Sequence, residues 1–166
     1  KEGETSPGLV WGPNMAIRRE VFDLGHRFDT LVGPNGKKNY AMGSETEFTH
    51  RISQLGYKSW FCKNAVVLHI IRDYQLDPKW IVKRAYRFGR NMYRQESESF
   101  DPDIPKLFGV PRWRLTKLLQ QCQCFIISFL LRERERKLNA LWEIEFLRGY
   151  FYESLCSNKR LKSNQS

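Results

Sequence analysis

Two long stretches of helical periodicity near the end of the chain place the strongest constraint on its fold. Apolar residues recur at i, i+3, i+4 and i+7 from Arg112 to Leu131, and a second pattern runs from Glu133 to Leu155. This spacing predicts amphipathic helices, each of which needs a partner for its apolar face. We therefore expect an amphipathic helical hairpin over residues 112–156, followed by a frayed polar tail over residues 157–166.

The first 95 residues carry a different pattern, in which strand and helix signals alternate. The expected strands are residues 9–18 (with a turn at 12–14), 57–62 and 65–71, the expected helices are residues 18–24, 45–55 and 79–95, and a loop is expected over residues 28–38. This alternation is typical of an α/β fold. The proline- and aspartate-containing stretch 96–111 then predicts a linker between this part, residues 1–95, and the helical hairpin.

Two of the expected helices have further features. Ser44 is the expected N-cap of the helix at 45–55, which Gly56 terminates. The helix at 79–95 has its basic residues on one side, which we expect to face solvent. These residues are Lys83, Arg87, Arg90 and Arg94.

The charge of the chain indicates an anionic partner. The 166 residues include 28 Lys+Arg and 18 Asp+Glu, a net charge of +10. From Arg72 to Ser166 there are 19 basic and 11 acidic residues, so most of the excess lies in the second part. Lipid headgroups, a phosphorylated ligand and nucleic acid all fit such a surface. No nucleic-acid-binding motif accompanies the basic helix at 79–95, so we expect no nucleic-acid partner.

The longest apolar run, residues 124–131, has eight residues, whereas a membrane-spanning helix needs about 20. We therefore expect a cytoplasmic protein that at most lies peripherally on the inner face of a membrane. The four cysteines lack the spacing of a zinc site and are too few for a disulfide scaffold, so reduced thiols are expected.

Five residues are candidates for chemistry, two of them at one helix start. Gly12 permits a close backbone approach to a ligand, and Asn14 offers an amide donor and acceptor, although an ordinary turn explains both. Glu45 and Glu47 lie in the first turn of an expected helix. A carboxylate there either only interacts with the helix dipole or acts as a general base. His69 ends an apolar strand, as a core or rim residue or as a functional imidazole.

Several segments between Leu9 and Arg94 resemble, in order, the C-terminal half of a family 2 glycosyltransferase. They read G-P-N-M-A-I-R-R-E, L-G-H-R-F-D-T-L, G-S-E-T-E-F-T-H-R-I-S-Q-L-G-Y-K and N-A-V-V-L-H. The resemblance implies part of a GT-A-type fold, with a mixed sheet. It also implies transfer of a sugar, with inversion, from a nucleotide-sugar donor to a hydroxyl of a polysaccharide, glycan or lipid-linked acceptor.

The resemblance also implies roles for individual residues. Glu45 matches the general base that deprotonates the acceptor hydroxyl. This chain has Ser44-Glu45 where the family usually has Glu-Asp, so the base could be placed differently or Glu47 could share its work.

Ligand contacts follow from the same resemblance. Gly12, Asn14 and Arg18 lie in the segment that binds substrate, and His69 matches a position that ligates Mg²⁺ or Mn²⁺ in some related enzymes. The family's metal-binding Asp-x-Asp has no match at a strand end, since Asp101-Pro102-Asp103 lies in the expected linker.

We therefore expect a fragment that begins inside the catalytic domain, lacks several sheet strands and is inactive alone. Two alternatives stay open, a non-catalytic basic module that binds membrane surfaces and an inactive truncated remnant.

Overall fold

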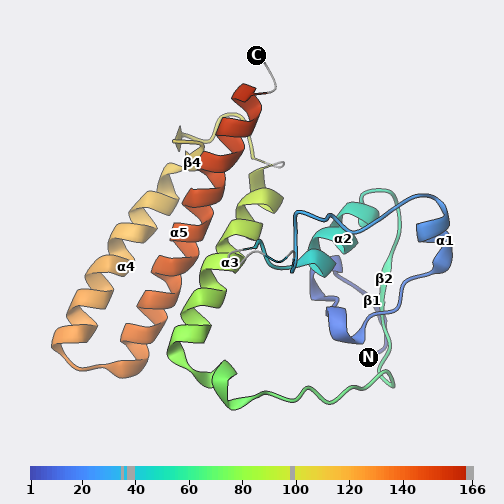
Figure 1. Cartoon of the computed structure of the whole chain (residues 1–166), viewed down its shortest axis with the longest axis horizontal. Coiled ribbons are helices and arrows are strands. Elements are labelled where there is room, and N and C mark those ends of the chain that lie inside the picture. Colours follow the sequence, from blue (N-terminus) through green and yellow to red (C-terminus); the bar gives the residue numbers. More distant parts are fainter. Residues whose placement is uncertain (35, 37–39, 98–99, 164–166) are drawn as a thin grey trace. The chain divides into compact units, whose positions relative to one another are not determined.

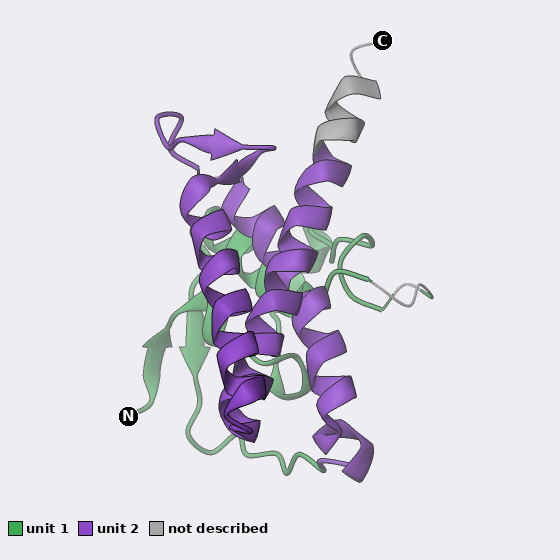
Figure 2. Ribbon diagram, turned by 90° about the vertical axis from the view of Figure 1, so that its left-hand side faces the viewer, with its two compact units in different colours: residues 1–70 green, residues 71–166 purple. Residues whose placement is uncertain are grey.

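The computed structural model describes residues 1–34, 36, 40–97 and 100–163, with side chains as far as Ser157. It is mostly helical, with five α-helices and two small antiparallel sheets among the described residues (Figure 1). The chain divides into two compact units, unit 1 (residues 1–70) and unit 2 (residues 71–166) (Figure 2). The sequence instead predicts a boundary after residue 95, at the start of the expected linker.

Unit 1 is built from short elements. Strand β1 (Gly3–Thr5) pairs antiparallel with β2 (Ser59–Phe61), so that Glu4 lies opposite Trp60. The remaining elements are the 3-10 helices η1 (Pro7–Leu9) and η2 (Gly12–Asn14) and the α-helices α1 (Arg19–Asp23) and α2 (Ser44–Ser53). The helices predicted at 18–24 and 45–55 are confirmed, as is a strand within 57–62.

Helix α2 carries the core of unit 1. Its Phe48 is fully buried and stacks on Phe28, with ring centroids 4.3 Å apart, and Ile52 packs with Val21 of α1. The residue that caps α2 is Gly43, not Ser44 as the sequence analysis expected. Gly43 has φ 101°, a left-handed conformation that favours glycine, and Ser44 is already helical.

Two predicted strands of unit 1 are wrong. Residues 9–18 contain η2 and irregular connections, because the Gly12-Pro13 pair favours a turn and Pro13 cannot donate to a strand ladder. Residues 65–71 form no strand although they are rich in β-branched residues, and Leu68 is 93% exposed. A single apolar run does not form a strand without a partner, and the described chain provides none here.

The expected mixed sheet is also not observed within the described ranges. Both sheets are antiparallel, and parallel pairing is limited to an isolated bridge between Val32 and Ala41. That bridge joins Val32, inside the loop predicted over residues 28–38, to Ala41, which follows the loop. This loop is irregular in its described part, while residues 35, 37 and 38 lie outside the described residues.

Unit 2 is a layer of three long helices. They are α3 (Pro78–Ser97), α4 (Arg112–Leu130) and α5 (Arg134–Ser163), and a 3-10 helix, η3 (Asp73–Leu76), precedes α3. Helix α5 lies between the other two and runs parallel to α3 and antiparallel to α4 (Figure 1). All three helices were predicted from sequence.

Two expectations in unit 2 need correction. Helix α5 continues through Ser163, so residues 157–163 are not a frayed tail, while 164–166 lie outside the described residues. The stretch expected to be a linker contains a small hairpin, in which β3 (Lys106–Leu107) pairs with β4 (Val110–Pro111). Val110 is fully buried in the core of unit 2, which anchors this hairpin.

Two glycines bring α3 and α5 into backbone contact. A Cβ atom at Gly89 would lie 1.9 Å from the carbonyl oxygen of Phe146, and one at Gly149 would lie 1.9 Å from that of Tyr86. No side chain fits at either position. The absence of both side chains therefore sets the distance between the two helices.

Buried ion pairs tie the helices of unit 2 together. The fully buried carboxylate of Glu153 on α5 accepts hydrogen bonds from Nε of Arg90 at 2.6 Å and from Nε of Arg94 at 2.7 Å. The expectation that these two arginines face solvent is therefore wrong. Their charges lie between the helices because Glu153 compensates them.

Candidate functional site

The candidate site of unit 1 is built around the η2 loop, residues 11–14. On one side lies Glu45, in the first turn of α2, where the positive end of the helix dipole stabilises a carboxylate. A Cβ atom at Gly12 would lie 3.3 Å from both the carboxyl carbon and Oε1 of Glu45. Ser44 Oγ donates a hydrogen bond to the other oxygen at 3.2 Å. Gly12 therefore permits the loop backbone to approach a half-buried carboxylate closely.

The other side of the η2 loop contacts the segment that follows β2. The side-chain amide of Asn14 donates a hydrogen bond to the carbonyl oxygen of Ala65 at 2.7 Å. The ring of Trp11 meets the His69 ring edge-on, with centroids 5.0 Å apart. One loop thus contacts Glu45 through Gly12 and His69 through Trp11. The structure therefore brings four of the predicted site positions together at this loop, which are Gly12, Asn14, Glu45 and His69.

Glu47 is engaged elsewhere. Its Oε1 accepts a hydrogen bond from Nε of Arg51 at 2.6 Å, and Nη2 of Arg51 also donates to the carbonyl oxygen of Arg27. The hydrogen bond from Glu47 is the main cause that raises the pKa of Arg51. Glu47 therefore positions Arg51, which connects α2 to the backbone at Arg27. Of the two predicted carboxylates, Glu45 is the one that lies beside Gly12.

An open pocket of about 1060 Å³ lies on unit 1. The residues that line it include Trp11, Asn14, Arg18, Ile52 and Trp60. Arg18 is mostly exposed and lies 3.6 Å from Glu20, which also lines the pocket. Two residues of the η2 loop, Trp11 and Asn14, therefore line the pocket. Glu45, Glu47 and His69 are not among the lining residues.

Sequence reasoning missed Thr49, which fixes the start of α2. Its buried hydroxyl lies 2.9 Å from the carbonyl oxygen of Pro7 in η1 and 2.8 Å from that of Glu45. Thr49 follows Glu45 by four residues in a helix, a spacing at which threonine commonly bonds back to the helix carbonyl. That spacing was a readable signal, whereas the contact with η1 was not.

The described residues of unit 1 do not form a site for Mg²⁺ or Mn²⁺. Within the described ranges no three His, Cys, Asp or Glu side chains are grouped so that they could hold a metal ion. His69 is exposed and has Trp11 as its ring neighbour. Mg²⁺ is bound mainly by oxygen ligands, which this surrounding does not supply. The described surroundings of His69 therefore do not fit Mg²⁺ or Mn²⁺.

Comparison with known proteins gave no match to a family model, a curated protein or a solved structure. Within the described ranges, the helices are all too short or too polar to cross a bilayer.

Proposed function

We propose that unit 1 is the acceptor-side part of an inverting, GT-A-type glycosyltransferase, with Glu45 as the general base. The ordered segments between Leu9 and Arg94 that resemble family 2 enzymes supply the reaction class. The observation that carries the proposal is the close approach of Gly12 to the Glu45 carboxylate, since these residues belong to two separate segments of that resemblance.

In the proposed reaction, Glu45 takes the proton of an acceptor hydroxyl as the hydroxyl oxygen attacks the anomeric carbon of the donor sugar. The bond from that carbon to the nucleoside diphosphate oxygen breaks, and the diphosphate leaves with the electron pair. A single displacement of this kind inverts the anomeric configuration. A positioned general base accelerates such a step by roughly 10²- to 10⁴-fold.

The exposed segment after β2 supports the same proposal. Val66, Leu68 and Ile70 are 75%, 93% and 79% exposed, an unusual setting for a nearly continuous apolar run. Such a run is typical of a buried strand in an α/β sheet. In the proposed enzyme, a donor-binding half provides both the neighbouring strands and the diphosphate site.

The test compares Glu45→Gln with Glu47→Gln in the chain joined to a donor-binding half ahead of Lys1. Release of nucleoside diphosphate from a panel of UDP-, GDP- and dTDP-sugars measures turnover in the presence of acceptor. Glu45→Gln should lower turnover by about 100-fold or more and leave donor binding unchanged, because only the proton acceptor is lost.

Glu47→Gln is the matched control, since it makes the same chemical change two residues away in the same helical turn. It should change turnover by less than about threefold. Equal losses in both variants, or full turnover in Glu45→Gln, would refute Glu45 as the base.

A further inference from the structure

The turn that joins α4 to α5 presents an unusual surface, which we call the hairpin tip (residues 126–137). Apolar side chains are exposed at every position from 126 to 131 except Ser128, and their exposed fractions range from 46% at Ile127 to 73% at Leu130. Ser128 is buried, and its hydroxyl donates to the carbonyl oxygen of Cys124 at 2.7 Å. The tip therefore exposes the apolar residues that would ordinarily be covered.

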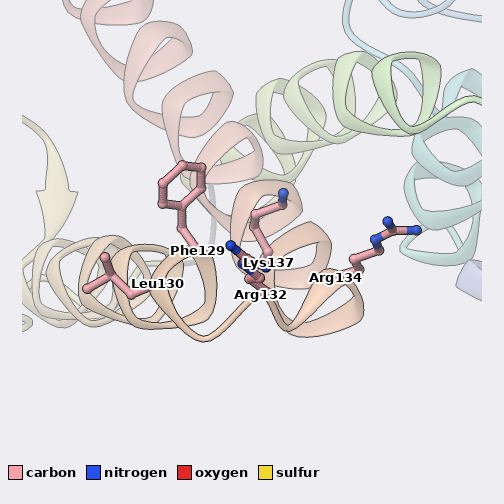
Figure 3. Close-up of a pocket in the computed structure, with 5 residues that line it drawn as sticks. All are labelled: Phe129, Leu130, Arg132, Arg134 and Lys137. Carbon is pink, nitrogen blue, oxygen red and sulfur yellow. The ribbon is translucent and has the colours of Figure 1, made fainter.

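Cationic side chains follow these apolar residues directly. Phe129 and Leu130 line a hollow of about 510 Å³ together with Arg132, Arg134 and Lys137 (Figure 3). The ammonium group of Lys137 lies 5.7 Å from the centre of the Phe129 ring. Figure 3 shows Phe129 and Lys137 on the same side of the turn. The hollow is thus lined by both apolar and cationic side chains.

The charges of the tip are only partly neutralised. Its two carboxylates are Glu133, which forms an ion pair with Arg136 at 3.2 Å, and Glu135. Within the described part of the chain, Arg132 and Arg134 have no ion-pair partner. These two guanidinium groups remain for an external anion.

We propose that the hairpin tip docks on an anionic lipid surface. Phe129, Leu130 and their apolar neighbours enter the boundary between headgroups and acyl chains, and Arg132, Arg134 and Lys137 meet the phosphate and carboxylate groups of the lipids. The charge of the tip complements such a surface, and its apolar residues leave water. The proposal concerns unit 2 alone and does not depend on Glu45.

Two other occupants fit the tip less well. A second copy of the chain, packed tip to tip, would bring the unpaired guanidinium groups of both copies together. A nucleic acid would satisfy the guanidinium groups but leave Ile126, Leu130 and Leu131 in water, because aliphatic side chains provide no stacking surface. An anionic bilayer accommodates both the apolar and the cationic groups.

Co-sedimentation of the full 166-residue chain with vesicles tests the proposal. Vesicles of phosphatidylcholine and phosphatidylserine at 3:1 should sediment the chain, and vesicles of phosphatidylcholine alone should retain much less. Raising the salt concentration should weaken the binding, since lipid and guanidinium charges are screened. The proposal would be overturned if the same amount of chain stayed in the supernatant with both kinds of vesicle. It would also be overturned if that amount were the same with and without vesicles.

Three variants locate the contact. Leu130→Glu should weaken binding about tenfold or more, because a carboxylate replaces an inserted apolar group near anionic lipid. Leu119→Glu is the matched control, since Leu119 is 66% exposed on the same helix but away from the tip, and binding should be unchanged. An equal loss in both variants would overturn the tip as the docking site.

The third variant, Arg132→Gly, separates binding from folding. Arg132 has φ 59°, in the left-handed region, where glycine is less strained than arginine. The fold should therefore be at least as stable, while the loss of one cation should weaken lipid binding about fivefold. Analytical ultracentrifugation tests the alternative that the tip is a self-association surface. If the wild-type chain forms a dimer that Leu130→Glu dissociates, and if the wild-type chain does not bind vesicles, the proposal is wrong.

Discussion

Replacing either glycine at the α3–α5 crossing should destabilise unit 2, although alanine is the better helix former. In an exposed helix, a change from glycine to alanine stabilises by about 1 kcal/mol. At Gly89 the new Cβ would lie 1.9 Å from the carbonyl oxygen of Phe146, so the two helices must separate by about 1.5 Å or more to reach an ordinary contact. Overpacking of this kind costs about 1–3 kcal/mol or more and opens the surrounding core. We expect Gly89→Ala to lower the free energy of unfolding by about 2 kcal/mol.

Gly149→Ala should act in the same way, through its contact with Tyr86. Because one separation of the helices relieves both clashes, the double variant should lose less stability than the sum of the two single variants. Urea unfolding followed by circular dichroism at 222 nm measures these values. Asn139→Ala, at an exposed position of α5, is the control and should change stability by less than about 0.5 kcal/mol. A Gly89→Ala variant as stable as the wild type would refute the reasoning.

Three further predictions test other features. Glu153→Gln removes the buried negative charge that pairs with Arg90 and Arg94 and should cost about 3–5 kcal/mol in urea unfolding. Glu133→Gln, at the surface, should cost less than about 1 kcal/mol, and equal costs in the two variants would contradict the role of the buried pair. Burial and a hydrogen bond to a carboxylate raise the pKa of Tyr150 above its ordinary value. The native state therefore holds this proton above pH 10, where the unfolded state releases it. Stability should fall with rising pH by up to about 1.4 kcal/mol per pH unit there, and a Tyr150→Phe variant with an unchanged slope would contradict this. Gly12→Ala should displace the Glu45 carboxylate and lower turnover about tenfold without unfolding unit 1; unchanged turnover would argue against the close approach.

The helices of unit 2 could be predicted because their apolar periodicity is local. The contacts between them could not, because Arg90 and Arg94 lie 63 and 59 residues from Glu153. The basic stripe on α3 therefore looked like a solvated face. Nothing in the local sequence showed that a buried carboxylate on α5 compensates two of its charges.

Strands were harder to predict than helices for a related reason. A helix satisfies its own hydrogen bonds, whereas a strand depends on a partner that local sequence does not identify. The run 65–71 has strong strand character, yet Leu68 is almost fully exposed. At the candidate site, sequence pointed to Gly12 and Glu45 separately. Their contact became visible only with the fold.

The anomeric configuration of the product tests the central proposal most directly. The chain joined to a donor-binding half is supplied with an α-linked nucleotide sugar, and the anomeric coupling constant in the proton NMR spectrum reports the configuration of the product. A single displacement assisted by Glu45 predicts a β-linked product, and no product with Glu45→Gln over the same time. An α-linked product would contradict the account, because retention of configuration excludes a single displacement with Glu45 as its general base.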